Sequence, residues 1–225
     1  MSSDFMVREA PWVIFGAGGH ALVVADIIWS RGAQIGALFS PVKPPAESPF
    51  AEVPFYSDDG LIEKFDPSSI VITVAIGMRP FSDTRKSIIS ELRKKKFFLS
   101  NVVSPRAIIS DLATLGEGVQ IMPGAVINAG AIIGDYSIIN SNAVIEHDTI
   151  IGSNCHIAPG AVICGGVNIN NDVFVGAGSV VRETVVLGKG VVIGATSFVA
   201  KDVPAHMVVR NQVVSHLVPK DRDDL

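Results

Sequence analysis

A six-residue period over residues 103–203 constrains the fold of this chain more than any other feature of its sequence. The first position of every hexad is Ile, Leu or Val, and the register does not slip over seventeen hexads. Neither the 3.6-residue period of a helix nor the two-residue period of a flat strand explains this spacing. The leading positions are Val103, Ile109, Leu115, Ile121, Ile127, Ile133, Ile139, Ile145, Ile151, Ile157, Ile163, Ile169, Val175, Val181, Leu187, Ile193 and Val199.

Each hexad is interpreted as one short strand followed by a corner, so that three hexads form one triangular coil. The leading aliphatic side chains would point inward and stack from coil to coil, as in other solenoids. The fifth residue of each hexad is small or β-branched, which fits a tight interior beside a corner. Glycine often follows the leading aliphatic, as at Gly116 and Gly134, where it eases the turn of the backbone. An ordinary β-sandwich is the alternative, and the unbroken register argues against it.

The first third of the chain alternates between strand and helix patterns. Apolar runs at 12–15, 35–40 and 68–77 read as strands, and residues 20–32 and 81–96 have helical spacing. Gly32 is placed to end the first helix. This alternation predicts a small parallel α/β domain that resembles a Rossmann fold.

The segment from Gly16 to Ala21 fits the pattern G-x-G-x-x-G/A between a strand and a helix. An NAD site also needs Asp or Glu at the end of the second strand, where this chain has Ser40, so NAD is not expected. Backbone N–H groups at the helix N-terminus still favour an anion such as a phosphate or a carboxylate. The alternative is a tight turn that binds no ligand.

Composition excludes several classes of function. The formal net charge is -4, which gives no reason to expect a nucleic-acid or anionic-membrane partner. The first residues lack a signal-peptide core, and no apolar stretch is long enough to span a membrane. Two cysteines exclude a disulfide scaffold and fit a reducing cytoplasm. No zinc-site spacing is present, so no metal is expected.

The repeats resemble the hexapeptide-repeat acyltransferases, which implies a left-handed parallel β-helix and a homotrimer with active sites between neighbouring prisms. Three stretches, VIFGAGGHALVVADII, VAIG and INSNAVIEHDTIIGSNCHIAPGA, narrow the resemblance. They are similar to the sugar O- and N-acetyltransferases of bacterial surface-glycan synthesis (PglD-type and NeuD-type) over residues 11–205. The expected division is a sugar-nucleotide domain at 1–100, an acyltransferase β-helix at 101–205 and a C-terminal tail at 206–225.

The resemblance also assigns roles to residues. His147 would be the general base, Asp148 would orient its imidazole, and Glu146 is the second choice for that task. Asn140 would line the active site. Residues matched to acetyl-CoA, the acyl donor, are His156 at the thioester and, along the pantetheine arm, Gly165, Gly176 and Ala195. Residues matched to the sugar nucleotide are Gly16, Gly18, Gly19, His20 and Gly77.

The residue chemistry of His147 is consistent with this role. An imidazole can accept a proton near neutral pH, and a neighbouring carboxylate fixes its tautomer. His147 stands at the third hexad position, so the register excludes it from the core, and the alternative is a surface histidine. Cys155 falls on an inward position, where packing explains it, and Cys164 has no base beside it. A backbone N–H near Gly165 is expected to stabilise the oxyanion.

Three positions depart from the family pattern. Ser40 replaces an acidic residue common in the UDP-binding members, Met78 replaces Asn in A-I-G-N, and the usual ending G-[NV]-P-A is absent. The first choice of function is N-acetylation of a nucleotide-linked 4-amino sugar. O-acetylation of a sugar hydroxyl, a non-catalytic sugar-nucleotide scaffold and a zinc protein like the γ-carbonic anhydrases are the alternatives.

Overall fold

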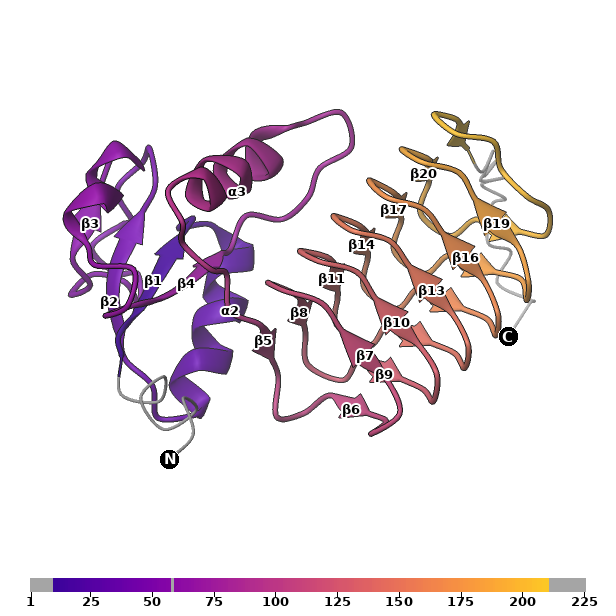
Figure 1. Cartoon of the computed structure of the whole chain (residues 1–225), viewed down its shortest axis with the longest axis horizontal. Helices are drawn as coiled ribbons and strands as arrows, with labels where there is room; N and C mark the ends of the chain where they lie inside the picture. Colours follow the sequence, from indigo (N-terminus) through magenta and orange to yellow (C-terminus); the bar gives the residue numbers. More distant parts are fainter. Residues whose placement is uncertain (1–9, 58, 211–225) are drawn as a thin grey trace, which may run out of the picture.

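The computed structural model describes residues 10–57 and 59–210, which form a small α/β unit beside a three-sided parallel β-helix (Figure 1). Both parts of the predicted fold class are therefore confirmed. Among the described residues, no helix is long and apolar enough to cross a membrane.

The N-terminal sheet has four parallel strands in the order β3-β2-β1-β4. The strands are β1 Trp12–Phe15, β2 Ile35–Phe39, β3 Phe55–Tyr56 and β4 Val71–Val74. Helix α2 (Gly19–Ser30) covers one face, and α3 (Thr84–Lys94) with the 3-10 helix η1 (Asp59–Lys64) covers the other. Because both faces are buried, the two central strands, β1 and β2, are apolar throughout instead of alternating.

Helix α2 ends just before Gly32, as its sequence predicts. Gly18 is the N-cap, and no side chain caps the first turn. At the other end Gly32 has a φ of 73° and donates its N–H to the Trp29 carbonyl at 2.9 Å. That left-handed conformation is accessible to glycine at low cost, which explains why the helix ends there.

The β-helix consists of two-residue strands that form three parallel sheets. The seven-stranded sheet contains β5 Val102–Val103, β8 Gln120–Ile121, β11 Ile138–Ile139, β14 His156–Ile157, β17 Phe174–Val175, β20 Val192–Ile193 and β22 Val208–Val209. The six-stranded sheet contains β6 Ile108–Ile109, β9 Val126–Ile127, β12 Val144–Ile145, β15 Val162–Ile163, β18 Val180–Val181 and β21 Phe198–Val199. The five-stranded sheet contains β7 Thr114–Leu115, β10 Ile132–Ile133, β13 Ile150–Ile151, β16 Asn168–Ile169 and β19 Val186–Leu187.

Strands one coil apart pair in register, as Ile139 does with Ile157. The second residue of each strand points inward and forms one continuous apolar column with the small residues at the fifth hexad position, such as Ala143 and Cys155. The predicted coil of three hexads and its inward side chains are both confirmed. Each coil buries its inward apolar side chains against those of its neighbours.

The last coil is two residues shorter than the others. Val192 pairs with Val208, and Leu187 forms a bridge with Val203, so the interval falls from eighteen residues to sixteen. The hexad register therefore stops before the β-helix does, and Val208–Val209 belong to its seven-stranded sheet although the sequence pattern places them in the C-terminal tail. The remainder of that expected tail, 211–225, lies outside the described residues.

The α/β unit packs on the outer face of the seven-stranded sheet, which we call the covered sheet. Val102 and Met122 of the first coils join the core beneath α2, and Gln120 and Ile138 are fully buried. In the five-stranded sheet, by contrast, outward side chains such as Ile150 stay exposed. This arrangement gives the prism one covered side and two open sides.

Candidate functional site

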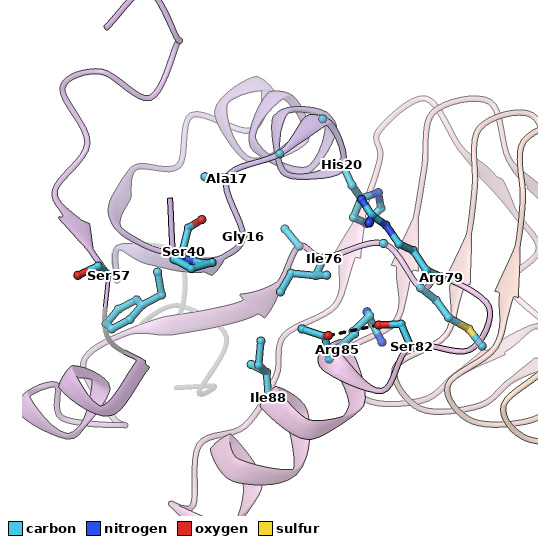
Figure 2. A pocket seen from close by; sticks show the side chains of 18 residues that line it. Gly16, Ala17, His20, Ser40, Ser57, Ile76, Arg79, Ser82, Arg85 and Ile88 are labelled. Atoms are coloured by element: carbon cyan, nitrogen blue, oxygen red, sulfur yellow. Dashed lines mark hydrogen bonds between the residues drawn. The ribbon is translucent and has the colours of Figure 1, made fainter. Parts of the chain in front are cut away.

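A cavity of about 880 Å³ lies at the C-terminal ends of β1, β2 and β4 (Figure 2). Helices α2 and α3 leave the sheet on opposite faces there, so a crevice opens between them, as at the ligand sites of other open α/β sheets. Gly16 makes the turn possible, because its φ is 118° and an added Cβ would lie 2.7 Å from the Ala75 carbonyl oxygen. No larger residue fits at this position without moving the backbone.

Several features of the cavity favour an anion. An added Cβ on Gly18 or Gly19 would meet no atom within 4 Å, so the N-terminus of α2 is open to the cavity. Helix α2 has no acidic residue in its first turn and no side-chain cap, and its first N–H groups have no partner within the helix. None of the described residues that line the cavity is Asp or Glu, whereas Arg79 and Arg85 line it.

Arg85 is a buried cation at the N-terminal end of α3. One of its Nη atoms donates to the Tyr136 carbonyl at 2.8 Å, and its Nε has no hydrogen-bond partner within residues 10–57 and 59–210. Burial lowers the pKa of Arg85 to about 10, so the guanidinium still carries its charge at neutral pH. Its positive charge adds to that of the helix N-terminus.

His20 joins the glycine-rich turn to the β-helix. Its Nε2 lies 2.8 Å from Oε1 of Gln120, a fully buried residue of the covered sheet. The Gln120 side-chain amide in turn donates to Thr73 Oγ1 at 2.9 Å and to the Val74 carbonyl at 3.0 Å. Burial lowers the pKa of His20, and the Gln120 hydrogen bond opposes that effect in part.

His156 is buried on the covered sheet and makes two polar contacts. Its Nδ1 lies 3.2 Å from the Met78 carbonyl oxygen, and its Nε2 lies 3.0 Å from the Asn140 side-chain nitrogen. Burial lowers the pKa of His156 to about 4, so the ring is neutral. Both ring nitrogens are occupied, so a thioester contact by His156 would require one of these bonds to change.

His147 and Asp148 form a second polar centre, away from the cavity. Asp148 Oδ2 lies 2.9 Å from His147 Nδ1, and the two side chains are 66% and 75% exposed. They lie at the corner between β12 and β13, which joins the six-stranded and five-stranded sheets; we call it the His147 corner. Since a carboxylate only accepts, Nδ1 carries a hydrogen in this contact, and in the neutral ring the lone pair is then on Nε2.

The other residue of the E-H-D triplet has a different contact. Glu146 accepts the backbone N–H of His147 at 3.3 Å and does not bind the ring. Gly165 lies one coil further along at the same corner, where an added Cβ would be 2.7 Å from His147 Nε2. The imidazole can lie over the backbone there because residue 165 has no side chain.

The remaining residues predicted for the site fall in two places. Gly176 and Ala195 meet at the corner that follows the covered sheet, where a Cβ on Gly176 would lie 2.5 Å from the Ala195 nitrogen. Gly77 lines the cavity beside His20. In a three-sided prism the His147 corner is opposite the covered sheet, so one chain does not bring His147 to its own cavity.

Sequence reasoning did not identify Arg85, Gln120 or Thr73. Arg85 stands in a helix pattern with other basic residues, and nothing there indicates burial. Gln120 could have been found from the sequence. It is the first residue of its strand, and on the covered sheet this position is otherwise apolar or His: Val102, Ile138, His156, Phe174 and Val192. A polar residue in this column, at a spacing of eighteen, indicates a specific partner.

The β-helix and the α/β unit are matched by two family models, and together they place the chain among the hexapeptide-repeat acyltransferases. The family model for the bacterial transferase hexapeptide matches residues 113–147 and 138–165, and the model for the PglD N-terminal domain matches residues 12–92. No curated protein sequence gives a significant match.

Solved structures narrow the class further. The chain is 32% identical to perosamine N-acetyltransferase from Caulobacter crescentus, with 88% of this chain and 92% of that chain covered and a TM-score of 0.80. That structure was determined with CoA and GDP-perosamine, on a variant in which one histidine is replaced by asparagine. The acetyltransferase domain of PglB from Neisseria gonorrhoeae, determined with acetyl coenzyme A, is 28% identical, with 89% and 95% covered and a TM-score of 0.78. WeeI from Acinetobacter baumannii is 25% identical, with 90% and 98% covered and a TM-score of 0.78.

The chain therefore belongs to the hexapeptide-repeat sugar acetyltransferase family, as its sequence motifs indicate, and is an acetyltransferase. For the zinc alternative, the repeats supply only His147 and His156, and these lie on different sides of the prism. Within residues 10–57 and 59–210, no three His, Cys, Asp or Glu side chains come close enough to hold a metal ion.

Proposed function

We propose that the protein transfers the acetyl group of acetyl-CoA to the amino group of a nucleotide-linked amino sugar, with His147 as general base. The observation that carries this proposal is the His147–Asp148 pair, whose 2.9 Å contact leaves Nε2 free to accept a proton. The first choice is a 4-amino sugar, as in the sequence-based expectation.

The chemistry follows from that geometry. The neutral amine attacks the thioester carbonyl, and His147 Nε2 takes the proton that the nitrogen loses as the new C–N bond forms. The C–S bond then breaks, and the thiolate takes that proton from the His147 imidazolium to leave as the CoA thiol, which restores the neutral imidazole. The Asp148 carboxylate holds the ring in the tautomer that can accept and stabilises the imidazolium that forms.

The cavity of the α/β unit supports a phosphorylated acceptor. An open helix N-terminus, two arginines and no described acidic lining residue favour a diphosphate. The Caulobacter relative was determined with GDP-perosamine, a nucleotide-linked sugar, which supports the same class here. Ser40 replaces the acidic residue common in the UDP-binding members, so UDP- and GDP-linked sugars both belong in the test.

Acetyl-CoA as donor is supported by the relatives determined with CoA or acetyl coenzyme A. Gly176 has no side chain and Ala195 has only a methyl group, so the main chain at their corner is accessible to an extended pantetheine arm. Asn140 lies at the same corner two coils earlier and retains one amide hydrogen beyond its bond to His156. We place the reaction in the cytoplasm, since both cysteines are free thiols.

We further propose that the active site needs a second copy of the chain. The cavity and the His147 corner lie on opposite sides of the prism, so a neighbouring subunit would supply the base to the acceptor. The five-stranded sheet beside that corner exposes Ile132 and Ile150 on adjacent strands, and Val186 beyond the polar Asn168; a further prism would cover these apolar side chains. A homotrimer is the expected assembly, and light scattering on the purified protein measures it.

The test is thiol release from acetyl-CoA with UDP-, GDP- and dTDP-linked amino sugars and free sialic acid as acceptors. We expect turnover with one amino sugar, a loss of at least about 10²-fold in kcat for His147→Asn, and a smaller loss for Asp148→Asn. His206→Asn is a matched control, because His206 also lies over a glycine but stands at another corner. No turnover with any acceptor, or full activity of His147→Asn, would refute the proposal.

O-acetylation of a sugar hydroxyl is the second candidate, because the same base would serve a hydroxyl nucleophile. Treatment of the product with hydroxylamine distinguishes the two, since esters are cleaved and amides are not. A non-catalytic scaffold would bind the sugar nucleotide without releasing thiol in the same assay.

A further inference from the structure

The orientation of the Gln120 side chain can be deduced from its partners. Gln120 is fully buried, and its amide lies 3.0 Å from the Val74 carbonyl oxygen. A carbonyl oxygen only accepts hydrogen bonds, so the group that faces it must be the NH₂ of Gln120. The side-chain oxygen of Gln120 therefore faces the other way, toward His20.

This orientation fixes the tautomer of His20. The Gln120 oxygen only accepts, so His20 Nε2 must carry the hydrogen in their 2.8 Å bond. In a neutral imidazole the other nitrogen, Nδ1, then has a free lone pair. Among the described residues, none forms a hydrogen bond to Nδ1, and His20 lines the cavity at the end beside the prism (Figure 2).

The second buried histidine has the opposite tautomer. The Met78 carbonyl can only accept, so His156 carries its hydrogen on Nδ1. Its Nε2 accepts from Asn140, whose oxygen in turn accepts the Ser141 N–H at 2.8 Å. His156 therefore has no unused nitrogen, and His20 Nδ1 is the free imidazole acceptor of the two.

We propose that His20 Nδ1 is a preset hydrogen-bond acceptor for a hydroxyl or amine hydrogen of the acceptor sugar, and that Gln120 is the positioning residue that presents it. This inference rests on the proposed function. A phosphate is excluded as the partner of Nδ1, because both groups are acceptors. The diphosphate would then lie along the N-terminus of α2 and the sugar at the prism end of the cavity.

Side-chain nitrogen NMR of the full-length protein tests the preset tautomer directly. Long-range proton–nitrogen spectra distinguish the two tautomers of a neutral imidazole, and loss of a signal in His20→Asn assigns it. We expect His20 to be protonated on Nε2 and His156 on Nδ1, so the two residues serve as internal references for each other. A His20 signal protonated on Nδ1 would overturn the inference.

Kinetics test the role of Gln120. In Gln120→Met the His20 tautomer is no longer fixed, and in Gln120→Glu a carboxylate would draw a second proton onto His20 and turn Nδ1 into a donor. For both variants we expect the KM of the acceptor to rise about tenfold, the usual effect of losing one hydrogen bond, with the KM of acetyl-CoA unchanged. Ser137→Ala is the matched control, because it removes a buried side-chain hydrogen bond, from Ser137 Oγ to the Gly152 carbonyl, in the interior of the β-helix, and its acceptor KM should change by less than about twofold.

The outcomes separate this inference from the proposed function. An unchanged acceptor KM in both Gln120 variants that keep the wild-type fold would overturn the positioning role while leaving the acetyltransferase proposal intact. If the wild-type protein turns over no acceptor, the proposed function fails and the sugar contact of His20 fails with it. The NMR experiment still decides the tautomer in that case.

Discussion

The substitution Gly165→Ala tests whether the position of the His147 imidazole matters for catalysis, because it moves the ring without changing its chemistry. The substitution leaves every proposed catalytic group in place. The φ of Gly165 is not in the left-handed region, so the backbone accepts alanine. The new methyl carbon, however, would lie 2.7 Å from His147 Nε2 and 2.8 Å from its Cε1, closer than ordinary van der Waals contact.

The structure sets the size of the effect. The ring must retreat by about 0.7 Å or more to restore ordinary contact, and a displacement on the order of 1 Å costs about 10²-fold in rate. The same shift stretches the 2.9 Å bond to Asp148 toward the limit of a hydrogen bond. We expect kcat to fall by about 10²-fold, or roughly 2.7 kcal/mol in activation free energy.

Thiol release from acetyl-CoA measures the loss, with kcat and the KM of acetyl-CoA determined separately. A displaced base lowers kcat, whereas a methyl group that only obstructs the pantetheine arm raises the KM of acetyl-CoA. Gly32→Ala is the stability control: it forces alanine into a φ of 73° at the end of α2, so it should lower stability by about 1 kcal/mol yet keep wild-type turnover. Wild-type kcat in Gly165→Ala would refute the reasoning.

Three further predictions follow from the structure. Burial lowers the pKa of His156 to about 4, so between about pH 6.5 and 4 the unfolded chain binds more protons than the native protein. As the pH is lowered through that window, the free energy of unfolding measured by denaturant titration should fall by up to about 3 kcal/mol, and by less in His156→Gln. Burial also raises the pKa of Cys155 to about 12, so Ellman's reagent should label Cys164 alone, and slowly, in the native protein, and both thiols after unfolding. Gly16→Ala places a Cβ 2.7 Å from the Ala75 carbonyl oxygen at a φ of 118°, and should lower stability by about 1–3 kcal/mol and raise the acceptor KM.

The sequence predicted the β-helix because its period is local. Every coil repeats the same backbone path, so the inward column of leading aliphatics could be read without knowing any contact. The prediction stopped short of β22, where the last coil loses two residues and the hexad pattern no longer registers it. A repeat can be recognised only while its spacing is kept.

The candidate site was predicted in part. The E-H-D triplet identified His147 and Asp148 as a pair, and adjacent residues at one corner can meet without help from the rest of the fold. The expected place of His156 near the thioester did not anticipate its bonds to Met78 and Asn140, because those bonds depend on how the α/β unit covers the sheet. The roles of these residues in catalysis stay predictions.

The sequence by itself determined the coil, its inward side chains, the glycine-rich turn and the family. Only the tertiary structure decided which outward residues are buried, and therefore which polar groups need partners. Gln120 forms hydrogen bonds to His20, which is 100 positions away in the sequence, and to Val74, which is 46 positions away. No local sequence pattern encodes such contacts. The physical reason is that hydrophobic periodicity is set by the backbone of each coil, whereas a hydrogen-bond direction in a buried interface is set by whichever donors and acceptors two distant surfaces bring together.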